Sequence, residues 1–377
     1  MKKQDQLKEL ARLFLKLGTT AFGGPAAHIA MMKQEVVDKR QWLTEAHFLD
    51  LIGATNLIPG PNSTEMAIHI GHEKAGWKGL IVAGLCFILP AVCITCFFAW
   101  LYKQYGLLPE VQPFICGIKP AIIAVILVAI FPLAKKSLKT FTLVIIGIVA
   151  LVLSIIGVSE IYIMFGAGLF LVALAIIKNR TDSQHVNGFI LLPWLQISVS
   201  SFVSAKNVSL FLIFLKIGSI LYGSGYVLFA FLDTELVQTG MLTKQQLIDA
   251  IAVGQFTPGP VFSAVTFVGY QINGFTGAAV ATLGIFLPSF VFVALLNPLV
   301  KKMRNSTYFS SFLDAVNVAS IALIVAVCFE MASSSITDWR TVVIAFISIV
   351  VTFGFRKVNS AFIVLGGALL GFMLSHF

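Results

Sequence analysis

The stretch GATNLIPGPNSTEMAIHIG, residues 53–71, decides the fold of this chain, because it places Pro-Gly-Pro inside an apolar segment. A second stretch of the same kind, AVGQFTPGPVFSAVTFVG, covers residues 252–269. Proline removes a backbone donor and clashes with the preceding helical turn, so an apolar helix must break at such a point. Inside a membrane, broken backbone is tolerated only where protein buries it or where it lines a water-filled cavity. The two stretches therefore predict broken helices that mark a site.

The composition is that of a membrane protein. Of the 377 residues, 58% are hydrophobic and 11% are charged, whereas a soluble globular domain carries about 25% charged residues. Apolar runs of about 20 residues, the length that crosses a bilayer, leave no room for a soluble domain. No signal-peptide cleavage is expected at the N-terminus. The sequence therefore predicts a multi-pass protein of the cell inner (plasma) membrane.

Membrane topology accounts for the net charge of +9. The basic residues form small clusters between apolar segments, the pattern of loops held on the cytoplasmic side. These clusters are Lys135, Lys136 and Lys139; Lys301, Lys302 and Arg304; and Arg356 and Lys357. No nucleic-acid partner is needed to explain them.

The two halves of the chain repeat each other with a shift of about 200 residues. FLKLG at 14–18 corresponds to FLKIG at 214–218, and Pro-Gly-Pro recurs at 59–61 and 258–260. The matches keep their order throughout. We therefore predict a first repeat over residues 1–180, a connecting loop over 181–205 and a second repeat over 206–377.

Ten apolar segments are expected to cross the membrane, five in each repeat. They are residues 10–32, 79–101, 115–133, 141–157, 161–177, 208–232, 277–299, 312–332, 342–355 and 360–375. Lys178 with Arg180 and the cluster at Lys301 are both expected on the cytoplasmic side. Two cytoplasmic ends require an even number of crossings between them, so each Pro-Gly-Pro segment should enter the membrane and leave on the same side.

Five crossings are an odd number, so the second repeat is expected to be inverted relative to the first, as in secondary transporters. The predicted fold is an all-α polytopic membrane protein with two homologous halves as an inverted repeat. Each half has about five spanning helices and one re-entrant Pro-Gly-Pro hairpin. This topology places Lys2, Lys3 and Lys8 outside the cell, against the charge rule.

Lys16 and its repeat mate Lys216 are candidate anion ligands. Lys216 lies ten residues past Lys206, which is about 15 Å along a helix and about halfway through the hydrocarbon core. An intramembrane lysine costs at least about 2.5 kcal/mol, which favours a functional role facing a cavity. The alternative is that both side chains extend to the interface. For Lys16, which lies in a more polar segment, the two interpretations are equally supported.

Glycine-rich sequences follow both lysines by six residues. Glycine permits close backbone approach and unusual torsions, and a proline frees a carbonyl group. Substrate contact and tight helix packing are equal alternatives for these positions. The residues are Phe22, Gly23, Gly24 and Pro25 in the first repeat and Tyr222, Gly223, Ser224 and Gly225 in the second.

A half-helix is expected to begin after each Pro-Gly-Pro. Its unpaired N–H groups and positive dipole end suit an anion, and a simple proline kink is the alternative. The first turn contains Asn62, Ser63 and Thr64 in one copy and Ser263 in the other, so the ligand should contact the first copy more than the second. Further candidate substrate contacts in the two broken segments are Asn56, Gly60, Gln255, Thr257 and Gly259.

Four shared acids are candidate proton carriers: Glu35 with Glu235, and Asp50 with Asp249. Helix capping or pairing with lysines is the favoured alternative for them. His28 is a candidate proton relay or ligand contact and equally a buried core histidine.

No metal or cofactor is expected. His69, His72 and Glu73 have helical spacing compatible with a metal, but no third strong ligand is apparent. The five cysteines are expected to be buried hydrophobic residues. The sequence contains no phosphate-binding loop, dinucleotide fingerprint or nucleophile elbow. The chain is therefore expected not to be an enzyme, and any energy source is an ion gradient or the membrane potential.

The chain resembles the chromate ion transporter (CHR) family in its long, two-domain form. The resemblance rests on FGGPAAHI at 22–29, NLIPGPNSTEMAIHIG at 56–71, YGSGY at 222–226, LTKQQLIDAIAVGQFTPGPV at 242–261 and GIFLPSF at 284–290. The matching motif residues are Gly23, Gly24, Pro25, His28, Pro59, Gly60, Pro61, Thr64, Pro258, Gly259 and Pro260. Tyr222, where phenylalanine is common, and Phe262-Ser263 are mild departures.

The resemblance implies export of chromate and chromate resistance, with sulfate as the related oxyanion. A dianion that leaves a cell with a negative interior gains about 4.6 kcal/mol per 100 mV, twice the single-charge value. Export by the potential alone and exchange for protons both fit. A sulfate transporter, an anion channel and a membrane reductase are the alternatives, and the chain is compatible with a homodimer.

Overall fold

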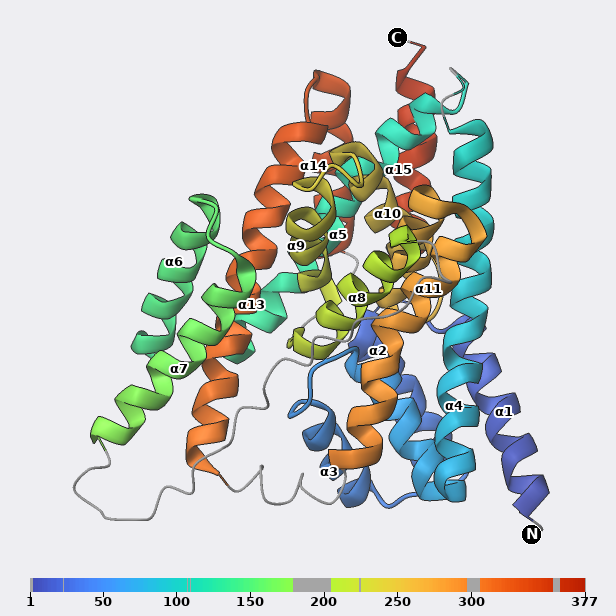
Figure 1. Ribbon diagram of the computed structural model, residues 1–377. Coiled ribbons are helices and arrows are strands. Elements are labelled where there is room, and N and C mark those ends of the chain that lie inside the picture. Colours follow the sequence, from blue (N-terminus) through green and yellow to red (C-terminus); the bar gives the residue numbers. More distant parts are fainter. Residues whose placement is uncertain are drawn as a thin grey trace.

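The computed structural model describes residues 3–22, 24–106, 108, 110–178, 205–223, 225–296, 306–354 and 360–376. All regular elements within these ranges are helices (Figure 1). The first half contains α1 (Lys3–Thr20), α2 (Gly24–Lys33), η1 (Gln34–Lys39), α3 (Glu45–Thr55), α4 (Asn62–Tyr105), α5 (Gln112–Ser137), α6 (Phe141–Ile155) and α7 (Glu160–Lys178). The second half contains α8 (Ala205–Ile220), η2 (Gly225–Val227), α9 (Leu228–Leu232), η3 (Asp233–Val237), α10 (Lys244–Phe256), η4 (Val261–Ser263), α11 (Ala264–Leu296), α13 (Thr307–Ser335), α14 (Trp339–Gly354) and α15 (Ser360–Leu374).

Eight apolar helical stretches in the described ranges belong to the membrane. Five are long and apolar enough to cross it: 62–105, 112–137, 160–177, 261–295 and 307–335. Three shorter apolar helices, α6, α14 and α15, accompany them. Their large exposed side chains are mostly hydrophobic, such as Phe141, Phe346 and Phe362, as expected for surfaces that face lipid. The chain is an all-α polytopic membrane protein, as predicted.

The first Pro-Gly-Pro segment forms a re-entrant hairpin. Helix α3 ends at Thr55, and α4 begins at Asn62 after Pro61, which is extended. His47 at the start of α3 lies 3.3 Å from Glu73, near the end of the first part of α4. The two arms therefore enter and leave at the same end.

A tight turn then redirects α4 to span the membrane. Ala75 and Gly76 leave helical geometry, with a φ of +62° at Gly76. After the turn the backbones of Gly71 and Gly79 touch, because a Cβ on either glycine would overlap the carbonyl of the other. The second repeat copies this geometry at Asn273 and Gly274 of α11.

The expected span over residues 10–32 is not one helix, which corrects the sequence prediction. Helix α1 ends at Thr20, Gly24 adopts a φ of +80°, and α2 runs back beside α1. Arg40 lies 3.8 Å from Glu9, so both arms of this segment end on the same side. Both arms are apolar, so the hydropathy of the segment shows no interruption. The reversal could therefore not be predicted from hydropathy.

The expected span over residues 208–232 is divided in the same way. Helix α8 ends at Ile220, and Gly223 has a φ of +94°. Lys216 of α8 contacts Glu235 of η3 across the reversal. Each repeat therefore contains two broken hairpins, where one was predicted, and two of the ten expected spans do not cross.

The two repeats are inverted relative to each other. In Figure 1, α3 lies near the lower end of the molecule and α10 near the upper end, while α4 rises to the top and α11 runs down to the lower edge. The N-terminus lies at the same end as the end of α7 and the start of α13. The start of α1 thus shares an end with the end of α7 and the start of α13, the helix ends next to which basic residues occur in the sequence, in agreement with the charge rule.

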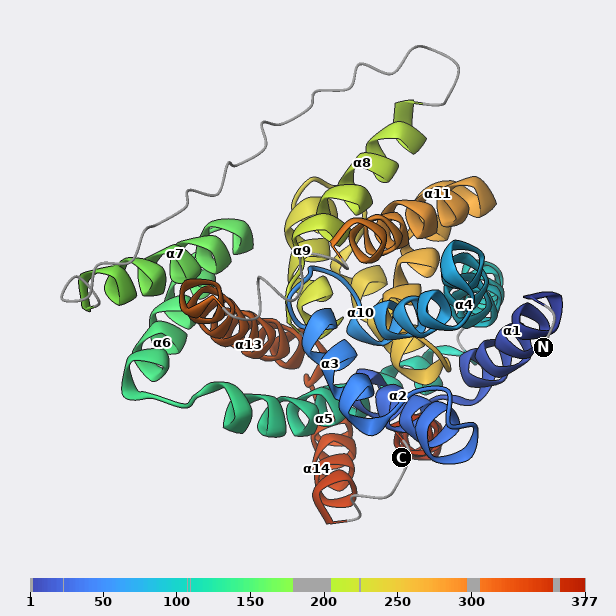
Figure 2. The same cartoon turned by 90° about the horizontal axis from the view of Figure 1, so that it is seen from below.

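The repeats exchange helices across their interface. Helix α5 of the first half packs on α14 and α15, and α13 of the second half packs on α6 and α7. Figure 2 shows α6, α7 and α13 on one side of the molecule and α1, α4 and α11 on the other. Gly117 of α5 approaches Gly367 and Gly371 of α15 so closely that no Cβ would fit, a small-residue contact typical of membrane helices. The largest cluster of buried hydrophobic residues accordingly contains residues of both halves, such as Ile122 and Leu323.

Candidate functional site

The four backbone breaks meet at the interface between the repeats. The N–H group of Gly60 donates to the carbonyl oxygen of Leu221 at 2.8 Å, and the N–H group of Gly259 donates to that of Ala21, also at 2.8 Å. Both glycines have a positive φ, +135° and +88°. Since Ala21 and Leu221 are repeat mates, the two bonds are symmetry equivalents. Each Pro-Gly-Pro is thus fastened to the glycine-rich break of the other repeat.

These bonds occupy several of the amides that were expected to face an anion. Both Pro-Gly-Pro glycines use their N–H groups across the interface, and the N–H groups of Thr64 and Glu65 donate to the Pro61 carbonyl. The N–H groups of Asn62 and Ser63, at the start of α4, take part in none of these backbone hydrogen bonds and could bind a ligand. Gly23 and Ser224 lie outside the described residues.

Polar side chains of the first repeat gather at the first Pro-Gly-Pro. Asn62 Nδ2 donates to Asn56 Oδ1 at 2.8 Å, and Asn56 is exposed. Ser63 and Thr64 are buried, and Thr64 Oγ1 has no hydrogen-bond partner among the described residues. This half of the centre offers an exposed amide pair beside a buried hydroxyl.

Glu65 belongs to the same turn and is not among the site residues predicted from the sequence. Its exposed fraction is 0%, and neither carboxyl oxygen has a hydrogen-bond partner in the part of the chain that the structure describes. The carboxyl group lies beside Gly60 and Ser289. The sequence signal that could have found it is an acid four residues past Pro61 in a largely apolar helix.

The second repeat presents neutral hydrogen-bonding groups at the equivalent place. Thr95 Oγ1 lies 3.5 Å from Thr257 Oγ1 and 3.3 Å from Ser263 Oγ, and all three side chains are buried. Tyr226 OH lies 3.5 Å from Gln255 Oε1, while Gln255 Nε2 has no partner among the described residues. Sequence comparison of the repeats missed Thr95, because this residue of α4 comes from the other half of the chain.

An apolar cavity of about 250 Å³ opens beside the second Pro-Gly-Pro. Thr257 and Pro258 of this segment line the cavity, together with Phe22 of the glycine-rich break in the first repeat. The remaining lining residues are Ile94, Ala361, Phe362 and Leu365. Because Phe362 and Leu365 are largely exposed on the apolar helix α15, the cavity faces the lipid and suits an acyl chain better than an anion.

His28 is buried in α2 against α4. Its ring lies 5.8 Å from that of Phe87, edge to face. Neither ring nitrogen has a side-chain hydrogen-bond partner among the described residues. The Gly24 backbone, one turn earlier, approaches the hydroxyl of Tyr226, so the start of α2 contacts the second repeat.

Both candidate lysines are paired with the shared glutamates. Lys16 Nζ lies 3.2 Å from Glu35 Oε1, and Lys216 Nζ lies 2.5 Å from Glu235 Oε1. The side chains are 59% and 34% exposed, respectively. The two pairs are equivalent, and each one bridges the arms of a glycine-rich hairpin.

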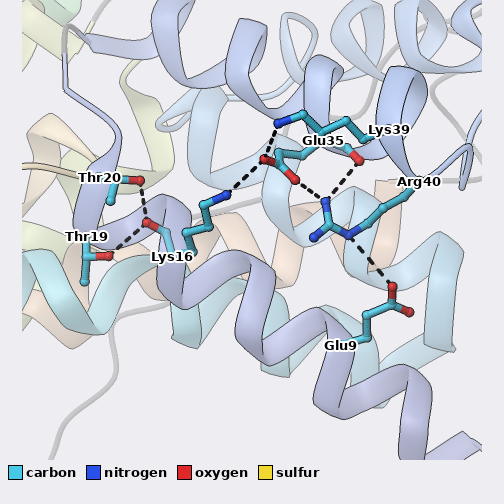
Figure 3. A network of polar contacts seen from close by, with 7 residues as sticks. All are labelled: Glu9, Lys16, Thr19, Thr20, Glu35, Lys39 and Arg40. Carbon is cyan, nitrogen blue, oxygen red and sulfur yellow. Dashed lines mark hydrogen bonds and ion pairs between the residues drawn. The ribbon is translucent and has the colours of Figure 1, made fainter.

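Glu35 is held by three cations (Figure 3). Lys39 Nζ donates to it at 3.0 Å, and Arg40 and Lys16 also bind it. Burial raises the pKa of Glu35, but the hydrogen bonds from Arg40, Lys39 and Lys16 outweigh it and lower the pKa to about 2. Glu35 is therefore ionised near neutral pH.

The second pair of shared acids differs between the repeats. Asp249 is buried, with Lys119 Nζ at 3.5 Å, Tyr102 OH at 2.6 Å and Gln245 Nε2 at 3.1 Å. Asp50, its repeat mate, is exposed on α3. Lys119 of α5 was not selected from the sequence, although it lies inside an apolar segment.

Broken helices from two inverted repeats that meet at a buried polar centre define a transporter-type membrane protein. The chromate transporter family model matches the chain twice, over residues 8–172 and 208–372. The chain belongs to the chromate transporter family.

Similar proteins occur in distant bacteria. A chromate transport protein of Cupriavidus metallidurans is 30% identical over 372 residues, 97% of this chain and 92% of that protein. A probable chromate transport protein of Synechococcus elongatus is 31% identical over 350 residues, 91% of this chain and 89% of its own length. An uncharacterised transporter of Bacillus subtilis is 23% identical over 153 residues, 40% of this chain but 86% of that protein, which is about the length of one repeat. No solved structure matches the chain.

Proposed function

We propose that the protein exports chromate from the cytoplasm across the inner (plasma) membrane. The observation that carries this proposal is the reciprocal joining of the broken hairpins, combined with membership of the chromate transporter family. The hairpins open toward opposite ends of the molecule (Figure 1). Rocking of one repeat against the other would therefore expose the centre to each side in turn.

The oxyanion would bind between the two Pro-Gly-Pro turns. A buried dianion requires several hydrogen-bond donors to replace its water. Asn62, Ser63 and Thr64 would supply donors from the first repeat, and Gln255, Thr257 and Ser263 from the second. Thr95 lies within hydrogen-bond range of the last two and completes a set of neutral groups.

The paired lysines would guide the anion at the two ends. Lys16 and Lys216 each contact one carboxylate and retain exposed surface. A dianion that approaches either lysine competes with the carboxylate for it, and the two positive charges would raise the local anion concentration. Because the repeats are inverted, one lysine would serve each side of the centre.

The membrane potential favours outward movement. The N-terminal end carries Lys8, Lys33 and Lys74, so the charge rule favours the cytoplasmic side for this end. A dianion that moves from a negative interior gains about 4.6 kcal/mol per 100 mV. That energy corresponds to about three decades of concentration. Export therefore needs no ATP.

Flux into proteoliposomes tests the proposal. Valinomycin and an inward potassium gradient make the lumen positive, and chromate in the lumen is followed by its absorbance. We expect accumulation with a positive lumen and none with a negative one, whatever the orientation of the protein in the vesicle. Empty vesicles are the control, and excess sulfate measures oxyanion selectivity. Equal chromate entry with and without protein would reject chromate transport, and entry that is insensitive to the potential would reject potential-driven export.

A further inference from the structure

The side chains around the two Pro-Gly-Pro glycines are different, although the backbone is the same. A Cβ at Gly60 would overlap the Glu65 carboxyl and the Ser289 hydroxyl. A Cβ at Gly259 would overlap Ala91 instead. Ala264 and Ala91 are the repeat mates of Glu65 and Ser289. The first break thus has a carboxyl and a hydroxyl where the second has two methyl groups.

Within the described part of the chain, Glu65 has no charge partner. In the described ranges, every lysine and arginine that forms an ion pair does so with another acid. Tyr222, at the glycine-rich break of the second repeat, is a titratable group from another segment that faces Glu65. On α4 itself, His69 follows one turn later and is also buried without a hydrogen-bond partner among the described residues. Packed against this stretch of α4 is α2, which contributes His28.

An ionised carboxylate is strongly disfavoured in these surroundings, because it loses its water and gains no cation among the described residues, and the Ser289 hydroxyl beside it offers at most one hydrogen bond. The neutral acid fits the same space at far smaller cost. Thr64, the neighbouring residue, belongs to the proposed oxyanion site, so a bound dianion would repel an ionised Glu65 directly. Burial and the charge of the ligand therefore both favour the neutral, protonated form of Glu65.

We propose that Glu65 is the proton-binding group linked to oxyanion binding, so that the dianion occupies the centre only when Glu65 is protonated. The proton is taken up by a carboxylate oxygen when the break is open to water and is released when the anion has left. This inference rests on the proposed oxyanion transport. The second repeat, with Ala264 at the equivalent position, takes no part in the proton linkage.

The test is chromate binding to the purified full-length protein in detergent, measured by calorimetry between about pH 7.5 and 9.5, where the ligand is mainly the dianion. With one linked proton, the affinity falls by up to about tenfold per pH unit once Glu65 ionises in the free protein. Glu65→Gln keeps the shape and is permanently neutral, so we expect wild-type affinity at the lower pH and no fall above it. Glu110→Gln, an exposed position between α4 and α5, is the matched control and should follow the wild type.

Each outcome is decisive. A wild-type affinity that does not change with pH overturns the linkage, and this measurement needs no variant to fold. A pH dependence that persists in Glu65→Gln assigns the proton to another group, and Tyr222→Phe identifies whether Tyr222 is that group. A folded Glu65→Gln protein that no longer binds chromate also overturns the inference. Absence of chromate binding to the wild type rejects the proposed function as well.

Discussion

The two halves of the molecule share one backbone design and differ in the chemistry that it carries. Both repeats contain a glycine-rich break and a Pro-Gly-Pro break, joined crosswise by equivalent 2.8 Å hydrogen bonds. The first break places a buried acid at Glu65, whereas the second gathers the hydroxyls of Thr257 and Ser263 with that of Thr95. The two repeats thus share the same backbone breaks. Their side chains differ, which allows the two halves to have separate roles.

The largest expected difference concerns the shared aspartates. Lys119→Ala would leave the buried Asp249 without its cation, and removal of one partner from a buried pair costs about 3–5 kcal/mol. Asp50→Ala, at the exposed mate, should change stability by about 0.5 kcal/mol or less. Thermal unfolding in detergent measures both. Similar stability of the two variants would show that the aspartates are equivalent despite their burial.

The next effect concerns the glycine at the first Pro-Gly-Pro. Gly60→Ala introduces a side chain at a positive φ and into the space of Glu65 and Ser289. The φ cost is about 1–2 kcal/mol, and the overlap adds to it, so transport should be lost. Gly76→Ala is the control, because Gly76 also has a positive φ but has open space around it. It should show the smaller loss of stability and retain chromate flux. Equal flux in both variants would argue against the central role of the first break.

The paired lysines provide a third comparison. If each lysine assists the dianion, Lys216→Ala should reduce chromate flux by about tenfold to a hundredfold, the loss of one charge-assisted hydrogen bond. Lys16→Ala should have the smaller effect, because its side chain is the more exposed of the two. Flux into proteoliposomes and chromate sensitivity of cells measure both. Unchanged flux in both variants would leave the lysines with a structural role only.

A smaller effect is expected for the hydroxyl group of the second centre. Thr95→Val keeps the shape but removes the group that approaches Thr257 and Ser263. Loss of a neutral hydrogen bond corresponds to about 0.5–1.5 kcal/mol, so chromate affinity should fall by about twofold to tenfold. Thr352→Val on α14, whose hydroxyl binds the Ser348 carbonyl, is the control. Equal affinities would place the oxyanion away from this cluster.

The smallest effect near neutral pH is expected for Glu35. Its pKa is lowered to about 2, so its ionised form stabilises the folded protein above the ordinary pKa, and this contribution is lost as the pH falls toward 2. Its contribution to thermal stability should therefore be constant between about pH 6 and 8 and decrease below about pH 5. In Glu35→Gln this acid-dependent part should be absent. A change in that contribution near pH 7 would show that Glu35 titrates there and restore it as a proton carrier.

Much of the fold was predictable from the sequence, because hydropathy, the repeat and the Pro-Gly-Pro motifs each carry a direct physical constraint. The reversal at Gly24 was not predicted. An apolar hairpin and an apolar span have the same composition, and only the contacts of Lys16 with Glu35 and of Arg40 with Glu9 distinguish them. The predicted number of crossings therefore included a span, residues 10–32, that does not cross the membrane. The inversion of the repeats that was predicted from this number is nevertheless present.

The candidate site was less predictable, since it depends on contacts between the repeats. Alignment of the two halves found shared residues and could not find Thr95 or Lys119, which act on the opposite half. Glu65 was missed for a related reason: its repeat mate is Ala264, so a search for residues common to both halves passes over it. Differences between repeats proved as informative as their identities.

The crosswise hydrogen bonds have a consequence for assembly. Gly60 and Gly259 each find their acceptor in the opposite half, so residues 1–180 produced alone would have a donor with no acceptor at the break. Such a half-length chain would have to associate with a second half, head to tail in the membrane, before its centre could close. Joining both halves in one polypeptide fixes their ratio and guarantees that two unlike halves meet.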